Sequence, residues 1–144
     1  MEKNKLKLQE ELQRNLLELE IYKKKFENLT QEMQMVELSL VELDNTKKAI
    51  NILKNEKSSG ETLVSIGSGV YSKANNLDNE KVLLGIGAGF YVEKTIDEAS
   101  KILDERMEKL SKVANEIQKN ASDVSDKISE LSNLSEDLLR ELQK

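Results

Sequence analysis

Apolar residues recur at alternating spacings of three and four along the first third of the chain. From Leu8 to Ile50 they fill two positions of a heptad repeat, and the exceptions are Asn15 and Lys47. The other positions are rich in Glu and Lys, which keep the remaining faces of a helix in water. A sustained pattern of this kind predicts a helix over about residues 5–55 that pairs with another helix along one seam.

A second heptad pattern runs from about residue 96 to residue 143. Its first position is always apolar and comprises Ile96, Leu103, Leu110, Ile117, Val124, Leu131 and Leu138. Its second position is mixed and comprises Ala99, Arg106, Val113, Asn120, Lys127, Leu134 and Glu141. Thr95 is the expected N-cap of this helix, with Asp97 and Glu98 in the first turn, where the helix dipole favours acidic residues.

Two arms of similar length, joined by a short connection, predict an antiparallel pair of helices. One register of this pair places Leu40 opposite Arg106, with Val36 opposite Leu110 in the next layer. The alternative register, one heptad away, places Lys47 opposite Arg106. Two cations in one layer repel each other, so the first register is favoured.

The segment between the arms, residues 61–95, carries a short β-forming pattern twice. All six glycines of the chain lie in or beside it, and Gly60 is the expected end of the first helix. The repeated motif is Ile66-Gly67-Ser68-Gly69-Val70-Tyr71, followed twenty positions later by Ile86-Gly87-Ala88-Gly89-Phe90-Tyr91. Glycine permits the positive φ of a tight turn, so each copy predicts a hairpin. The expected strands are residues 63–66, 70–74, 82–86 and 90–95, with a turn at 75–79.

Four strands of about five residues cannot form a stable sheet without exposed edges. The segment is therefore expected to be an assembly module that pairs with other chains. Its alternating apolar residues should line an interior shared between subunits, and they are Val64, Ile66, Val70, Val82, Leu84, Ile86, Phe90 and Val92. The expected fold class is α+β, a long antiparallel two-helix coiled coil with two β-hairpins inserted between the helices.

The composition agrees with a seam rather than a globular core. Aromatic residues make up 3% of the chain, charged residues 34%, and proline is absent. With neither His nor Cys, the chain has no imidazole base, thiol nucleophile, thiolate metal site or disulfide. The net charge of −5 argues against general nucleic-acid binding. No apolar run is long enough for a membrane span, so a soluble, cytoplasmic protein is expected.

The paired glycines are the strongest candidate for chemistry. Gly67-x-Gly69 and Gly87-x-Gly89 suggest a phosphate-binding loop, but Ser72 and Val92 stand where the dinucleotide motif needs its third glycine. A strand also follows each pair where that motif requires a helix, so hairpin turns are favoured. Asp123 with Asp126 reads as an exposed helix face rather than a metal site. We therefore expect no catalytic residues, no metal and no cofactor.

The order of arm, double hairpin and arm resembles the α-class subunit of prefoldin, a holdase chaperone. The motifs that carry the resemblance are residues 61–69, Glu-Thr-Leu-Val-Ser-Ile-Gly-Ser-Gly, and residues 86–94, Ile-Gly-Ala-Gly-Phe-Tyr-Val-Glu-Lys. Ser65 departs from the family, which often has proline there. The resemblance implies that hairpins of several subunits form a β-barrel and that the whole chain, 1–144, is one prefoldin-like domain. It also implies β-class subunits or copies of itself as partners, and a group II chaperonin as a further partner.

By the same resemblance, the free ends of the arms bind non-native polypeptides without ATP. The residues expected to do so are the leucines near both termini, Leu6, Leu8, Leu12, Leu16, Leu17, Leu134, Leu138, Leu139 and Leu142. Of these, Leu8, Leu12, Leu134 and Leu138 fall on the expected seam. Two other functions stay open, a structural protein that polymerises through its hairpins and a coiled-coil adaptor for one folded partner.

Overall fold

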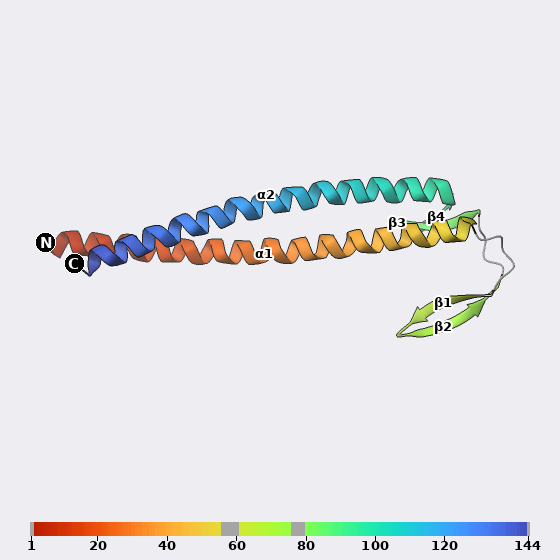
Figure 1. Cartoon of the computed structure of the whole chain (residues 1–144), viewed down its shortest axis with the longest axis horizontal. Helices are drawn as coiled ribbons and strands as arrows, with labels where there is room; N and C mark the ends of the chain where they lie inside the picture. Colours follow the sequence, from red (N-terminus) through yellow and green to blue (C-terminus); the bar gives the residue numbers. More distant parts are fainter. Residues whose placement is uncertain (1, 56–60, 76–79, 144) are drawn as a thin grey trace. The chain divides into compact units, whose positions relative to one another are not determined.

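The computed structural model describes residues 2–55, 61–75 and 80–143. They form helix α1 (Glu2–Asn55), strands β1 (Thr62–Gly67), β2 (Val70–Ala74), β3 (Lys81–Gly87) and β4 (Phe90–Thr95), and helix α2 (Ile96–Leu142) (Figure 1). This order confirms the expected α+β class, with two long helices and two hairpins between them. Gly60, the expected end of the first helix, and most of the expected turn at 75–79 lie outside the described residues.

The chain packs as two units, and each contains part of both helices. We call them the arm unit (Met1–Leu38 with Ser111–Lys144) and the hairpin unit (Ser39–Leu110). In the hairpin unit, Lys47 forms an ion pair with Asp104, and Lys54 forms one with Asp97. Residue numbers that rise along α1 therefore meet numbers that fall along α2, as antiparallel pairing requires.

The core of the hairpin unit forms where α1 ends and α2 begins. Ile50, Ile96, Ala99 and Leu103 are buried together, and Val82 of β3 packs against them. Burial of these side chains contributes about 25 cal/mol for each Å² of apolar surface removed from water. The β3–β4 hairpin is thus held against the helices by an apolar contact of Val82 as well as by its covalent connection to α2.

The core of the arm unit corrects the expected registers. Leu29, Ile117 and Val124 form one buried cluster. The favoured register would set Leu29 opposite Ile117, and the alternative would set it opposite Val124. Because Leu29 packs in a cluster with both, the layers lie between the two registers, and neither expectation was correct.

The physical reason is a shift of the buried line along α2. Beyond Leu110 it runs through Ala121 and Ile128, whereas the expected seam residues were Asn120 and Lys127. Alanine and isoleucine lose less hydration on burial than an amide or an ammonium group does. A straight α-helix also drifts by about 20° per heptad relative to a strict seven-residue repeat.

The junction between β4 and α2 confirms the expected N-cap. The Thr95 hydroxyl accepts a hydrogen bond from the backbone N–H of Glu98 at 3.2 Å. The Glu98 carboxylate accepts one from the N–H of Thr95 at 3.0 Å. This reciprocal pair is a capping box, which satisfies two backbone donors at the helix start. The N–H of Ile96 donates to the carbonyl of Glu80 at 3.0 Å, so the start of α2 is also bonded to the residue before β3.

Both hairpins turn through two residues with left-handed backbone conformation. In the second hairpin, Ala88 has a φ of 50° and Gly89 a φ of 78°, and the first hairpin repeats this at Ser68 and Gly69. Positive φ at both central residues is the type I′ geometry, which matches the twist of the flanking strands. A bulge precedes each turn, where the strand register shifts. Ala88 carries a Cβ in a conformation that disfavours one.

We expect Ala88→Asn to stabilise the second hairpin, because asparagine tolerates left-handed φ better than alanine does. The midpoint of urea unfolding, followed by circular dichroism, should rise by an amount equivalent to roughly 0.5–1 kcal/mol. Gly89→Ala is the matched control with the opposite sign, since it adds a Cβ where φ is positive. A fall in stability for Ala88→Asn would contradict this account of the turn.

Candidate functional site

The hairpins leave unpaired strand edges. In the described chain, β1 pairs only with β2 and β3 only with β4, both antiparallel. Every strand therefore has one edge whose backbone N–H and C=O groups face away from its partner. An isolated two-stranded hairpin is marginally stable in water, so these edges are sites for the addition of another strand.

The eight expected assembly residues divide into two groups. Most are exposed, with Ile66 and Phe90 each at 68% and Val64, Val70 and Ile86 also exposed, and Val92 is half-buried. In contrast, Leu84 is buried, and Val82 packs against the core of the hairpin unit. For Val82 and Leu84, contact with their own chain already accounts for the burial, which the sequence pattern did not indicate. A shared interior lined by the eight residues stays a prediction.

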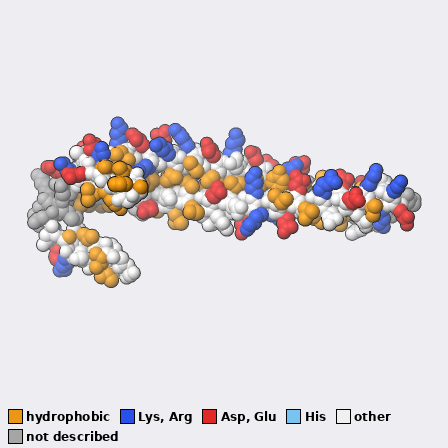
Figure 2. Space-filling model, turned by 180° about the vertical axis from the view of Figure 1, so that it is seen from behind, with side chains coloured by type: hydrophobic (Ala, Val, Ile, Leu, Met, Phe, Trp, Pro, Cys, Tyr) orange, Lys and Arg blue, Asp and Glu red, His pale blue; other side chains and the backbone are white. Residues whose placement is uncertain are grey.

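The sequence reasoning missed the apolar residues on the alternate positions of the strands. They are exposed in the single chain and comprise Leu63, Tyr71, Leu83 and Tyr91. Figure 2 shows apolar side chains gathered on both hairpins. The missed signal was the presence of consecutive apolar residues, as at Val82-Leu83-Leu84, where a strand with one solvated face would alternate. Apolar side chains therefore occur on both faces of each hairpin.

A glycine allows one of these aromatic residues to lie across its neighbouring strand. Gly85 pairs with Tyr91 in the sheet, and a Cβ at position 85 would lie 3.3 Å from Cε1 of the Tyr91 ring. The ring thus occupies the space that a side chain on Gly85 would need. The same glycine is bonded to α2, because the Arg106 guanidinium donates to its carbonyl oxygen at 2.8 Å. Arg106, expected on the seam, instead holds β3.

The arm unit contains all nine leucines expected to bind clients. Five of them are exposed, namely Leu6, Leu16, Leu17, Leu134 and Leu139. Leu8, Leu12 and Leu142 are half-buried, and Leu138 is buried. Leu134 was expected on the seam, but it is 41% exposed because the seam has moved to Ser135. The structure therefore separates leucines that hold the helices together from leucines that face solvent.

Two polar residues interrupt the seam within the arm unit. Asn15 and Ser135 are buried, and the Ser135 hydroxyl donates to the carbonyl of Leu131 at 2.8 Å. The Nδ2 of Asn15 is the one buried side-chain nitrogen or oxygen without a hydrogen-bond partner among the residues described. An unsatisfied buried amide costs about 1–3 kcal/mol, so this layer weakens the seam near its free end.

The described residues supply no cluster for a metal ion, because they hold no group of three or more carboxylates in reach of one another. The Gly67 and Gly87 loops are the bulges that precede the two hairpin turns, and neither opens a helix. Within the same ranges, neither helix contains a stretch whose length and hydropathy suit a bilayer span.

The described chain thus has two kinds of exposed apolar surface, the hairpins with their free strand edges and the leucines near the ends of the helices. A profile described as "Prefoldin subunit" matches residues 22–141. The chain is 32% identical over 107 residues to a prefoldin subunit alpha of Methanopyrus kandleri, which covers 74% of this chain and 68% of that protein. It is 39% identical over 93 residues to that of Methanosarcina barkeri, covering 61% and 63%. The chain therefore belongs to the prefoldin family.

Solved structures support the same fold. A filamentous prefoldin from Methanocaldococcus jannaschii has a TM-score of 0.70 and 20% identity, covering 79% of this chain and 94% of that one. The prefoldin beta subunit of a Thermococcus strain has a TM-score of 0.59 and 22% identity, covering 90% and 93%. At these identities the likeness concerns the fold. The chain spans between 61% and 68% of the length of the first three curated relatives.

We expect Asn15→Leu to stabilise the paired helices, because it removes the unsatisfied amide and adds apolar contact. The free energy of unfolding in urea should rise by about 1–3 kcal/mol. Asn15→Asp is the opposing control, since it places a charge at the same buried position. If Asn15→Leu leaves the midpoint unchanged, the amide has a partner in solution and the weak-layer description is wrong.

We expect Ile86→Asp to prevent assembly without unfolding the chain. Ile86 is 57% exposed in the single chain, so the carboxylate remains hydrated there, but assembly would bury it unpaired. Light scattering should show single chains, while circular dichroism should show the helix content of the parent. Val41→Asp places the same charge on an exposed residue of α1 and should leave the molar mass unchanged. An Ile86→Asp protein that keeps the parent mass would exclude Ile86 from the interface.

Proposed function

We propose that this chain is a subunit of an ATP-independent holdase that assembles through its hairpins and binds non-native polypeptides with the ends of its arms. The observation that carries the proposal is the presence of exposed leucines near both termini, on helices whose seam is closed by other residues. Leu6, Leu17 and Leu139 are 59%, 58% and 44% exposed. Membership in the prefoldin family, whose members are chaperone subunits, supports this reading.

Binding by such leucines should be broad in specificity and weak for each arm. A leucine contributes about 1.5–3 kcal/mol if a client buries it fully. The weak polar layer at Asn15 lets the terminal turns separate and adapt to different apolar segments. Several arms on one assembly raise the affinity by multivalency. A holdase needs this combination, because it must hold many different unfolded chains and release them.

Assembly is proposed with β-class prefoldin subunits, with copies of this chain, or with both. A second candidate is a structural protein that polymerises without closing, which the free edges on both hairpins favour. The prefoldin of M. jannaschii is described as filamentous, and rotation between neighbouring subunits decides between rings and filaments. A closed complex with a β-class subunit favours the holdase, and a ladder of masses from this chain alone favours the filament.

The holdase proposal includes two further statements. The chain acts in the cytoplasm, and the assembly transfers its clients to a group II chaperonin.

We expect a triple variant, Leu6→Ser, Leu17→Ser and Leu139→Ser, to lose most of its suppression of client aggregation. All three residues are exposed, so the helices should remain folded while apolar contact with the client is lost. The measurement is light scattering of a chemically unfolded client diluted into buffer with the assembled protein. The matched control is Leu38→Ser, Val41→Ser and Ile52→Ser, three exposed apolar residues of α1 that are distant in sequence from the proposed client-binding leucines.

The oligomer mass of both variants is measured in parallel to separate assembly from binding. Equal protection by the terminal variant and the parent protein would refute client binding by the arm ends. Equal loss in both triple variants would mean that apolar surface anywhere on α1 suffices, which also contradicts the proposal.

A further inference from the structure

The arm unit contains a groove between α1 and α2 that the proposed client-binding leucines do not touch. Its volume is about 510 Å³. The apolar part is formed by Leu29, Met33, Ile117 and Ala121, with the Phe26 ring as one wall. The remaining lining is polar and comprises Thr30, Gln34, Glu37, Gln118, Ser122, Ser125 and Asp126. A groove with an apolar floor and a polar rim is a typical binding surface for an apolar side chain.

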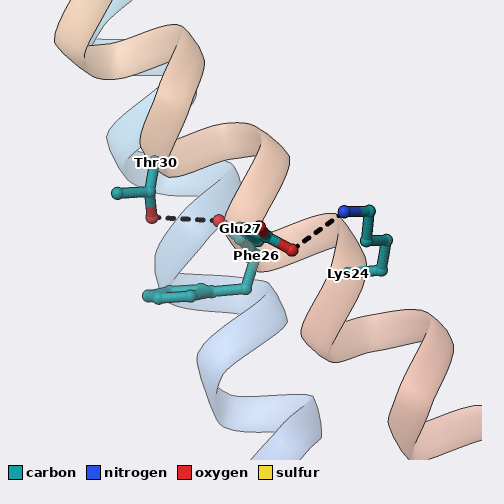
Figure 3. Close-up of polar contacts among 4 residues, drawn as sticks. All are labelled: Lys24, Phe26, Glu27 and Thr30. Atoms are coloured by element: carbon teal, nitrogen blue, oxygen red, sulfur yellow. Dashed lines mark hydrogen bonds and ion pairs between the residues drawn. The ribbon is translucent and has the colours of Figure 1, made fainter.

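The groove exists because a large residue of α1 meets small residues of α2. Phe26 is 39% exposed although it occupies a heptad seam position, and Ala121, Ser122 and Ser125 line the same space. Figure 3 shows the Phe26 ring extending over α2, beside Thr30. The Thr30 hydroxyl donates to the Phe26 carbonyl at 3.0 Å, which satisfies that hydroxyl within α1. The ring therefore presents apolar surface that the two helices leave uncovered.

The charge on the groove has one sign. Glu37 and Asp126 line it, and none of its twelve residues is basic. Both carboxylates are on exposed residues, and neither forms an ion pair with another residue in the described ranges. Lys24 is paired with Glu27 at 3.0 Å, and in Figure 3 this pair lies on the other side of α1 from the Phe26 ring. The groove is thus complementary to a ligand that carries positive charge.

The two carboxylates mark opposite ends of the groove. Phe26 and Glu37 are eleven residues apart on α1, which corresponds to about 16 Å along a helix axis. Because the helices are antiparallel, Asp126 lies toward the Phe26 end and Glu37 toward the Ile117 end. An extended chain rises by about 3.3 Å per residue, so about five residues span this distance.

We propose that this groove is a second client site, which binds an extended segment of non-native polypeptide with apolar side chains in its middle and a basic residue at each end. The apolar side chains lie against Phe26 and Leu29, and the basic residues approach Asp126 and Glu37. The site rests on the holdase function proposed above and adds a preference to it. The terminal leucines select for apolarity alone, whereas the groove selects for apolar segments flanked by Lys or Arg.

The test uses the full-length assembled protein and two fluorescein-labelled peptides, Lys-Leu-Val-Leu-Lys and Glu-Leu-Val-Leu-Glu, with fluorescence anisotropy as the readout. The parent protein should bind the basic peptide more tightly. The double variant Glu37→Lys and Asp126→Lys should weaken that binding by about fivefold at low salt and favour the acidic peptide instead. The weakening should be much smaller in 1 M salt, where the Debye length is about 3 Å.

Two further variants make the test specific to the groove. Ala121→Leu adds a larger apolar side chain to the lining and should weaken binding of both peptides. Glu32→Lys with Glu116→Lys changes the net charge by the same amount at exposed positions that do not line the groove, and it should leave both affinities unchanged. Circular dichroism of each variant checks that the helices are intact.

Three results would overturn the proposal. They are equal affinity of the parent protein for the two peptides, equal weakening by the control double variant, and a change of oligomer mass in the Glu37→Lys and Asp126→Lys protein before peptide is added. The last result would assign the groove to contact between copies of the chain. The variant with three terminal leucines replaced should still bind the basic peptide, so failure of the groove and failure of the arm ends remain distinguishable.

Discussion

Within the described ranges, each strand has a hydrogen-bonded partner strand on one side only. That constraint governs the rest of the molecule, because two-stranded hairpins with apolar residues on both faces cannot satisfy either their backbone or their side chains alone. The helices bury only a seam and a small cluster around Ile50 and Ile96. The free strand edges and the exposed apolar side chains of the hairpins are therefore the parts of the chain that gain most from contact with a further strand.

Most of the architecture could be predicted from periodicity. Two heptad arms, six glycines gathered in one segment and a capping residue at Thr95 were sufficient for the element order and the α+β class. The register of the helices could not be predicted, because the buried positions of α2 beyond Leu110 no longer follow the heptad pattern of its first turns. Whether Asn120 or Ala121 is buried against α1, and likewise Lys127 or Ile128, depends on the cost of desolvating the side chain rather than on spacing.

The surfaces were less predictable than the elements. Alternation along the strands led us to expect Ile66 and Phe90 on an assembly surface, but it left out the exposed apolar residues Leu83 and Tyr91. It also could not show that Leu84 is buried within the single chain. The groove at Phe26 was also invisible, since it arises from a size mismatch between residues about ninety-five positions apart, Phe26 and Ala121. Spacing shows which residues share a face, but it does not show how well two faces fill the space between them.

The capping box at Thr95 has a consequence for the geometry of any assembly. Strand β4 ends at Thr95 and α2 begins at Ile96, so one peptide bond joins sheet to helix and no linker residue can act as a hinge. One residue inserted there would turn α2 by about 100° about its axis and carry its apolar face away from α1. The direction of an added strand and the orientation of the helix are thus set by a single joint. Insertions or deletions at this junction should therefore disrupt the structure far more than insertions or deletions at the ends of the arms.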